Sequence, residues 1–286
     1  DTTPKLKLNL GTENPKYAEY SSGNGDAVHV FKYIVVDGDN ISELDVTGIT
    51  TAGFTWFDVS DVNTKVENIG IPVVEANQLK GNRDIVIDTK APTVSSFEEI
   101  LASGNYNLGK QLYFAVSFSE EVNITGLSKD NVQLEFNNGQ YSSEVTKTGP
   151  SSLLFKYVVT AGHDTSALKA KNILFKNVTV NDNAGNVLSG DKIQVSGGSK
   201  AYNIDTDAPA KPVISLPEGV TSDTPVYEDS VTFTITGFED AAGTQKKYKV
   251  DNGSLNDYTG DVTISSNGEH TVYAYQIDAA GNQGEN

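Results

Sequence analysis

Carboxylate side chains recur in two short motifs along this chain of 286 residues. Two linker-like segments, 88–92 and 205–209, read Asp-Thr-x-Ala-Pro, and two loops, 182–186 and 278–282, read Asp-x-Ala-Gly-Asn. Calcium binds about six to eight oxygens from carboxylates, amide carbonyls and water, whereas magnesium demands a tighter octahedral shell. The motifs therefore favour calcium binding, rather than magnesium binding, as the chemistry open to the chain.

Strand order predicts that the two motifs meet. In a sandwich of seven antiparallel strands, the loops after the second and sixth strands lie at the end where the incoming linker joins. Acidic pairs occupy the first of these loops, and the Asp-x-Ala-Gly-Asn motifs occupy the second. We therefore predict calcium sites beside the two linkers. The candidate ligands are Asp88, Glu120, Glu121, Asp182 and Asn186 for the first linker, Asp205, Asp207, Glu239, Asp240, Asp278 and Asn282 for the second, and Asp58, which matches Asp182 in an internal repeat.

The same residues have a simpler explanation. Asp, Asn and Gly are the ordinary residues of turns, and any single aspartate here is more readily explained as a turn former than as a ligand. Carboxylates gathered without a cation would repel one another or have raised pKa values. Calcium binding and plain turn formation both remain open from the sequence.

Catalytic chemistry finds little support. The chain has no cysteine, which excludes a thiol nucleophile, a disulfide and a cysteine-ligated metal. Its three histidines, His29, His163 and His270, fall in different repeats, and the common hydrolase, zinc-protease and phosphate-loop motifs are absent. We expect no enzyme. The single tryptophan, Trp56, is either a core residue or a platform on which a sugar ring could stack.

The formal net charge is −17, from 21 basic and 38 acidic residues. Phosphate backbones repel such a chain, so we expect no nucleic-acid partner. The acidity is typical of a solvated surface or of carboxylates gathered for hard cations. No apolar run reaches the roughly 20 residues of a membrane helix, so we expect no membrane-embedded segment.

Strands are predicted nearly throughout. Alternating apolar and polar residues, punctuated by Gly, Asn and Asp, are typical of antiparallel strands with one buried face, and residues 231–236 and 272–277 show this pattern. The middle of the chain allows about seven strands, which favours an immunoglobulin-like sandwich. They are expected at 93–97, 110–118, 131–136, 141–148, 153–159, 175–180 and 200–204, with a short helical turn at 164–170.

The chain also repeats itself. Phe-Lys-Tyr-Ile-Val-Val at 31–36 returns as Phe-Lys-Tyr-Val-Val-Thr at 155–160, and Gly and Leu residues farther on match at the same offset. The first repeat lacks counterparts of the first two strands, and the last lacks a final strand. Either the chain is a fragment of a longer protein, or neighbouring chains complete one another by strand donation. The linker motifs divide it into domains at 1–88, 89–205 and 206–286.

The linker motif, the Phe-Ser-Glu-Glu-Val strand end at 118–122 and the Asp-x-Ala-Gly-Asn loops resemble tandem bacterial immunoglobulin-like repeats of large surface proteins. The resemblance covers nearly the whole chain. It implies an all-β fold of tandem immunoglobulin-like sandwiches arranged as an elongated rod. It also implies an extracellular place on the bacterial cell surface, as in repetitive adhesins and biofilm matrix proteins, and stalks that calcium stiffens between domains.

Three functions are compatible with these observations. The first is a structural spacer, in which each unit contacts its neighbours and length grows with copy number. The second is an adhesive module that binds a carbohydrate or a host-surface protein, for which Trp56 is the candidate contact. The third is a subunit of a sheath, S-layer or filament that assembles by strand donation between adjacent chains.

Overall fold

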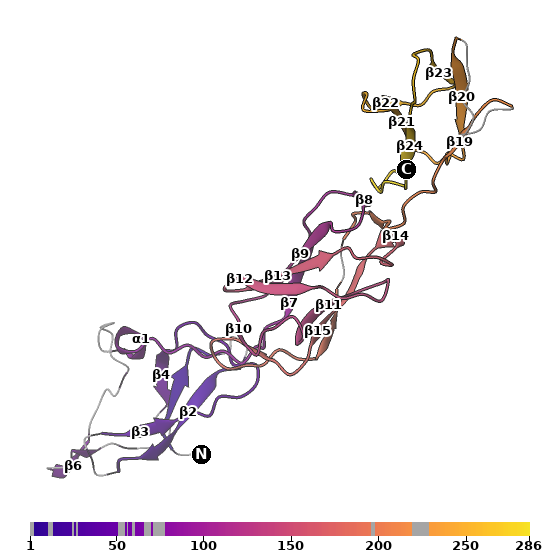
Figure 1. The fold of residues 1–286 in the computed structure, drawn as a ribbon. Helices are drawn as coiled ribbons and strands as arrows, with labels where there is room; N and C mark the ends of the chain where they lie inside the picture. The colour runs from indigo at the N-terminus through magenta and orange to yellow at the C-terminus, as the bar shows by residue number, and fades with distance from the viewer. Residues whose placement is uncertain are drawn as a thin grey trace. The chain divides into compact units, whose positions relative to one another are not determined.

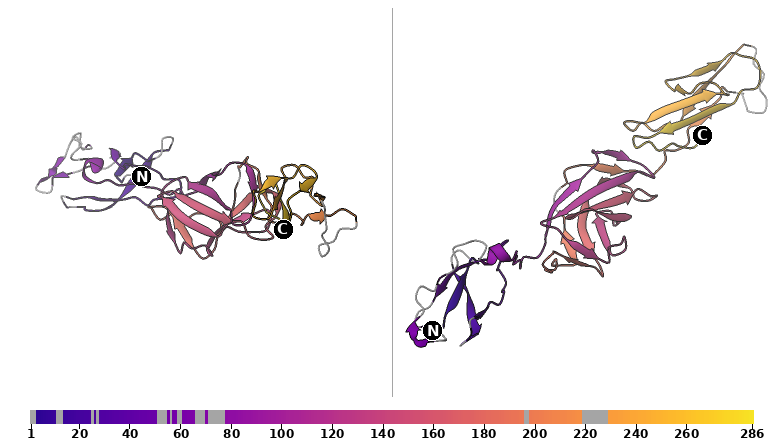
Figure 2. Two further views of the ribbon diagram at one scale, coloured as in Figure 1. Left: turned by 45° about the horizontal axis from the view of Figure 1, so that its top comes forward. Right: turned by 90° about the vertical axis from the view of Figure 1, so that its left-hand side faces the viewer.

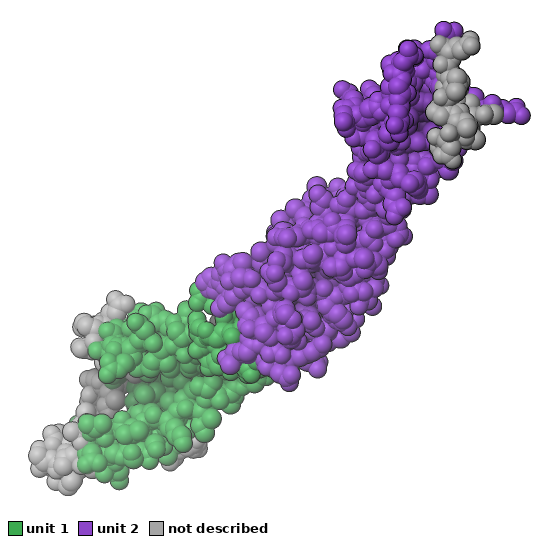
Figure 3. Space-filling view, viewed as in Figure 1, with its two compact units in different colours: residues 1–93, 120–124, 179–189 green, residues 94–119, 125–178, 190–286 purple. Residues whose placement is uncertain are grey.

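The computed structural model describes residues 3–10, 14–24, 26, 28–50, 55, 57–58, 61–65, 70, 78–195, 198–218 and 229–286. These residues form strands almost throughout, with one four-residue helix, α1 (Leu79–Asn82), so the all-β prediction is confirmed (Figure 1 and Figure 2). None of the described helical residues makes a helix long and apolar enough to cross a membrane. The chain divides into two compact units (Figure 3). Unit 1 comprises residues 1–93, 120–124 and 179–189, and unit 2 comprises residues 94–119, 125–178 and 190–286.

Unit 1 is built on a four-stranded antiparallel sheet in the order β3-β2-β1-β4. Its apolar face packs Leu8, Leu10 and Leu44 into a small core, against which Phe31 and Tyr33 lie half-buried. Two shorter strand pairs, β5 with β6 and β10 with β16, complete the described strands. The bounds are β1 (Lys5–Leu8), β2 (Lys16–Ser22), β3 (Val30–Lys32), β4 (Val46–Thr50), β5 (Phe57–Asp58), β6 (Asp61–Lys65), β10 (Asn123–Thr125) and β16 (Thr179–Asn181).

The first part of unit 2 is a β-sandwich. A four-stranded sheet, β12-β13-β9-β7, faces a three-stranded sheet, β11-β15-β17, because Phe114 of the first sheet packs on Phe136 of the second with ring centroids 5.1 Å apart. Alternate residues of the central strands are buried, as their period-2 pattern predicts. The bounds are β7 (Val94–Glu99), β9 (Gln111–Phe118), β11 (Val132–Phe136), β12 (Glu144–Gly149), β13 (Ser152–Val158), β15 (Ala170–Phe175) and β17 (Lys192–Gln194).

A third sheet in this part corrects one expectation. The helical turn predicted at 164–170 is wrong: the segment forms β14 (Thr165–Leu168), which pairs with β18 (Tyr202–Ile204). β18 pairs in turn with β8 (Gly104–Tyr106) in parallel. Leu168 is fully buried in this sheet, so strand pairing and burial outweigh the local preference of a short polar segment.

The last part of unit 2 has two three-stranded sheets, β19-β20-β23 and β22-β21-β24. Phe233, Ile235 and Ala274 form its buried core, and Tyr248 and Tyr258 pack against them. The alternation predicted at 231–236 and 272–277 is confirmed by two six-residue strands. The bounds are β19 (Val213–Ser215), β20 (Val231–Thr236), β21 (Gln245–Val250), β22 (Asn256–Asp257), β23 (Val262–Ile264) and β24 (Val272–Ile277).

The internal repeat is visible in the hydrogen bonds. β11 pairs with β15 as β1 pairs with β4, and β12 pairs with β13 as β2 pairs with β3. Gly38 donates its N–H to Thr89 Oγ1 at 3.0 Å, and Gly162 donates to Thr206 Oγ1 at 3.1 Å. Both glycines have positive φ, which glycine adopts most readily. Equivalent loops thus hold the threonine of each linker motif, and the three-domain division remains a prediction.

Candidate functional site

The first Asp-x-Ala-Gly-Asn loop follows β16 and is organised by its own aspartate. Asp182 Oδ1 accepts hydrogen bonds from the backbone N–H groups of Gly185 (2.7 Å) and Asn186 (2.8 Å), and Oδ2 accepts one from Asn186 Nδ2 (2.7 Å). Gly185 has φ of +98°, a conformation that other residues rarely adopt. The motif therefore specifies a tight turn around one buried carboxylate.

That carboxylate remains ionised. Burial alone would raise the pKa of Asp182, which is only 2% exposed. Hydrogen bonds from the Asn186 amide and from the backbone of Asn186, Gly185 and Ala184 outweigh the burial and hold the pKa below its ordinary value. A buried anion at neutral pH is a suitable partner for a hard cation.

Asn186 connects the loop to the linker. Its Nδ2 donates a second hydrogen bond to the backbone oxygen of Asp88, at 3.0 Å. Asp88 Oδ1 accepts a hydrogen bond from the N–H of Lys90 at 2.9 Å, so the linker aspartate is fixed on both sides. The side-chain nitrogen of Asn186 thus clamps the chain where the linker begins, and ligation by its oxygen remains a prediction.

Three carboxylates from distant parts of the sequence meet here. One oxygen each of Asp88, Glu120 and Asp182 lies within 4.8 Å of the other two. Two oxygens bound to the same calcium ion at about 2.4 Å can be at most about 4.8 Å apart, so the separation fits a calcium shell. Each of the three residues offers one such oxygen, so water or carbonyl oxygens would complete the six to eight ligands that calcium takes. The donor set therefore fits calcium in type and spacing.

Glu121, the other acid of the pair, has a different partner. Its Oε2 accepts a hydrogen bond from Asn183 Nδ2 at 3.2 Å, and Asn183 Oδ1 accepts one from Asn123 Nδ2 at 3.2 Å. The two asparagines tie β10 to the loop after β16. Sequence reasoning did not select them, because an exposed asparagine in a turn carries no specific signal.

The second Asp-x-Ala-Gly-Asn loop, after β24, repeats the geometry of the first. Asp278 Oδ1 accepts from the N–H groups of Gly281 (2.8 Å) and Asn282 (2.9 Å), and Oδ2 accepts from Asn282 Nδ2 (2.8 Å). Asn282 Nδ2 then donates to the backbone oxygen of Asp205 at 3.0 Å. Two loops of the same motif thus clamp two linkers through the same atoms.

Like charges surround Asp205 in this second cluster. Burial raises the pKa of its carboxyl above the ordinary value, and the charges of Asp278, Asp164 and Asp207 raise it further. Nearby, the Asn107 side chain lies beside Gly281, and its amide oxygen is buried without a hydrogen-bond partner. A cation would stabilise this arrangement.

The two acids of the pair near the second linker each bind a partner outside the cluster around Asp205. Glu239 Oε1 accepts from the N–H of Ala210 at 3.0 Å, and Asp240 forms an ion pair with Lys246 at 2.7 Å. The fully buried Gln276 also holds this linker, donating to Ala210 O at 2.6 Å. Among the residues that the structure describes, Asp88, Glu120 and Asp182 are the only three acids that each have a carboxylate oxygen within 4.8 Å of one on both others.

Two candidates of the sequence analysis fall elsewhere. Trp56 lies outside the described residues, and Asp58 lies in β5, with its side chain not described.

Asp39 was not selected, although it is 3% exposed, forms an ion pair with Lys16 (3.2 Å) and accepts a hydrogen bond from Tyr33 (2.5 Å). A lone aspartate after a glycine gave no signal of this role.

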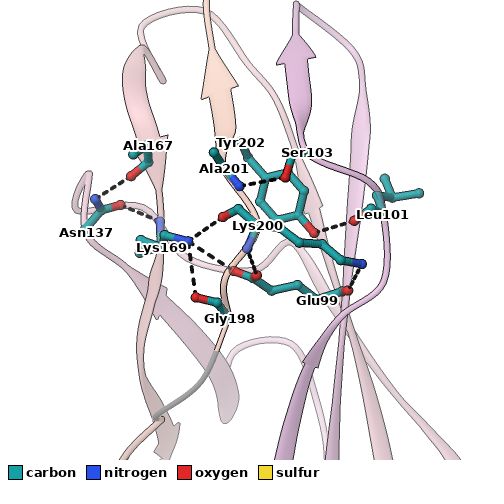
Figure 4. A network of polar contacts seen from close by, with 10 residues as sticks. All are labelled: Glu99, Leu101, Ser103, Asn137, Ala167, Lys169, Gly198, Lys200, Ala201 and Tyr202. Carbon is teal, nitrogen blue, oxygen red and sulfur yellow. Dashed lines mark hydrogen bonds and ion pairs between the residues drawn. The ribbon is translucent and has the colours of Figure 1, made fainter.

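Glu99, the last residue of β7, anchors a separate polar network (Figure 4). It is 4% exposed, accepts from the N–H of Lys200 at 2.8 Å and lies 3.8 Å from Lys169 Nζ. A Cβ at Gly198, where φ is +98°, would lie 2.6 Å from the Glu99 carboxyl carbon, so the glycine is required for this contact. Lys169 Nζ and the N–H of Lys200 thus tie the end of β7 to the residues that precede β15 and β18.

Comparisons with known proteins give weak likenesses. No protein-family model and no curated protein matches the chain. Fibronectin(III)-like modules of Clostridium thermocellum CbhA are 15% identical, with 68% of this chain and 88% of that chain covered and a TM-score of 0.27. A DUF4785 family protein from Legionella pneumophila is 14% identical (64% and 46% covered, TM-score 0.25). Domains 5–6 of the S-layer protein SbsC are 12% identical (67% and 94% covered, TM-score 0.18). Likenesses of this size carry no argument on function.

Proposed function

We propose that the chain is a structural spacer segment of an extracellular bacterial surface protein, built from immunoglobulin-like modules. Each linker between modules is held by loops that come before and after it in the chain. The observation that carries the proposal is the repeated clamp, in which Asn186 and Asn282 each bind the backbone oxygen of a linker aspartate. A spacer needs linkers of defined geometry, and identical clamps at two linkers supply it.

Calcium is the cofactor that this proposal assigns to the first linker. A bound ion would neutralise Asp88, Glu120 and Asp182 together and tie the linker to the loops after β9 and β16. These three side chains would hold the ion, with the depressed pKa of Asp182 keeping one ligand ionised. The ion adds only electrostatic cross-linking, which restricts the linker and protects it from cleavage.

Isothermal titration of calcium into the full chain, stripped of metal, tests this assignment. We expect saturable binding that Glu120→Gln weakens at least tenfold, because the substitution removes a ligand charge without touching the hydrogen bonds of the Asp182 turn. Glu98→Gln, on the exposed face of β7, removes the same charge and should leave the affinity unchanged. Equal affinities for both variants, or no calcium binding by the parent chain, would refute the site.

A further inference from the structure

The last part of unit 2 contains an open pocket of about 300 Å³. It lies where β20 ends and where the chain crosses from β22 to β23. β23 pairs with β20 from Val231 to Phe233, so the last residues of β20 extend beyond this neighbour. There the hydroxyl oxygen of Tyr258 accepts the N–H of Ile235 at 2.9 Å. The pocket thus forms at a point where an aromatic side chain, rather than a strand, satisfies the backbone of β20.

Two aromatic rings line this pocket. Phe238 and Tyr258 have ring centroids 5.2 Å apart, and their planes are inclined by 32°. Both side chains are half-buried, so part of each ring remains open to solvent. Tyr258 is fixed by its bond to Ile235 and by a T-shaped contact with the ring of Tyr248, at 6.2 Å between centroids. The rings therefore offer a preformed apolar surface.

A hydrogen-bond donor and an acceptor lie beside the rings. Lys246 Nζ is 2.7 Å from Asp240 Oδ1 and 5.6 Å from the centroid of the Phe238 ring. The Asp240 side chain is 91% exposed and that of Lys246 is 33% exposed, so both charged groups can reach a ligand. Their charges balance, which favours an uncharged ligand, and the net charge of −17 further disfavours an anion.

A pyranose sugar has the chemistry that these groups recognise. Aliphatic C–H groups on the face of its ring pack on aromatic side chains, and its hydroxyls both donate and accept hydrogen bonds. Small-molecule sites combine apolar walls with a few placed polar groups and occupy about 300–1,000 Å³. The pocket meets the lower end of that range, which suits a short sugar segment. A wholly apolar ligand would leave the charged pair without partners on desolvation.

We propose that this pocket binds a neutral pyranosyl sugar, with the C–H face of the sugar against Phe238 and Tyr258 and its hydroxyls bonded to Asp240 and Lys246. This inference goes beyond the spacer function, because it gives the segment a ligand of its own. Asp88, Glu120 and Asp182 do not line the pocket, so the sugar site and the calcium site can fail separately.

Titration of cellotriose, maltotriose and chitotriose into the isotope-labelled full chain tests the proposal by NMR. We expect at least one of these uncharged trisaccharides to shift the amide signals of Thr236, Gly237 and Gly260, which line the pocket, and to do so saturably at millimolar concentration. If none of the three shifts these signals, or if saturable shifts occur only elsewhere in the chain, the proposal is wrong.

The aromatic contact is tested with a matched pair of variants and the trisaccharide that binds. Phe238→Leu keeps an apolar side chain in contact with the core and removes the aromatic face, so it should weaken binding at least fivefold. Tyr273→Leu is the control, because Tyr273 also carries a lysine over its ring, Lys249 at 4.9 Å, and does not line the pocket. Equal affinities for these two variants would overturn the proposal.

The polar contact has a matched pair of its own. Asp240→Ala removes the acceptor of the pocket and should weaken binding at least fivefold, with little risk to the fold because the side chain is exposed. Asp257→Ala removes the exposed partner of Lys247, at 2.5 Å, and should bind as the parent chain does. Unchanged affinity in Asp240→Ala, or an equal loss in both variants, would contradict the assigned hydroxyl contacts.

Discussion

At the scale of single residues, a comparison of the two Asp-x-Ala-Gly-Asn loops distinguishes the contacts that form the turn from those that indicate a metal ligand. Asp182 and Asp278 each form the same turn, so turn formation explains why the motif carries an aspartate in both places. Turn formation does not explain why Asp88 and Glu120 approach Asp182. That second feature, present at the first linker alone among the described residues, is the basis of the calcium proposal.

Asp205 gives a pH-dependent prediction. Its pKa in the folded chain is raised by burial and by Asp278, Asp164 and Asp207, so its ionised form destabilises the fold. Because the folded pKa lies above the unfolded one, this destabilisation is present at neutral pH and disappears as the pH falls through the folded pKa. In EDTA, Asp205→Asn should therefore be more stable than the parent chain at pH 7, and its advantage should shrink on acidification.

Urea unfolding of both proteins at several pH values measures this difference. The difference in stability between parent and variant removes the pH-dependent contributions of the other carboxylates, because both proteins contain them. A constant difference between pH 7 and pH 4 would contradict the assigned cause, and so would a variant less stable at neutral pH.

At the scale of elements, the linker clamp is the feature most open to test. Asn186→Ala removes the donor to Asp88 O and to Asp182 Oδ2 and leaves both oxygens without that partner. Loss of hydrogen bonds to partly buried acceptors costs about 1–3 kcal/mol of stability. Asn123→Ala, which removes an exposed bond between two side chains, should cost less than about 0.5 kcal/mol in the same urea experiment.

Limited proteolysis adds a local readout of the same variant. Cleavage near Lys90 should accelerate in Asn186→Ala and remain unchanged in Asn123→Ala, because only the first change releases the linker. Equal cleavage rates in the two variants would show that the clamp does not restrict the linker.

The elements themselves were largely predictable from the sequence. Period-2 alternation identified β9, β11, β13, β20 and β24, because each buries one face. Strand order then correctly placed Asp88, Glu120 and Asp182 together. β14 was mistaken for a helical turn, since its strand state depends on pairing with β18, which local sequence does not encode.

The hydrogen-bond and ion-pair partners of individual site residues were harder to predict from the sequence than the loops that carry them. Glu239 and Asp240 occupy the expected loop, yet one binds Ala210 and the other Lys246. Asp164 and Gln276 went unselected, although both act at the second linker. For Gln276, an inward-facing polar residue in an alternating strand was the available signal, because a buried amide needs hydrogen-bond partners.

At the scale of the whole molecule, the charge of −17 connects the acidic clusters to stability. Self-repulsion destabilises a folded chain with so many uncompensated carboxylates, and bound divalent cations relieve it. A chain without cysteine would gain from such cross-links what disulfide-containing modules gain from cystines. Calcium binding and resistance to unfolding are therefore expected to rise and fall together.

Thermal unfolding of the full chain in millimolar calcium, in EDTA, and in EDTA with calcium restored is the direct test of a stabilising calcium ion. Calcium at 100 times its Kd adds about 2.7 kcal/mol of stability, so we expect a Tm that is highest in calcium, falls in EDTA and recovers when calcium is restored. Magnesium at the same concentration should give a smaller rise. The same Tm under all three conditions would contradict a stabilising calcium ion and leave the acidic motifs as turns alone.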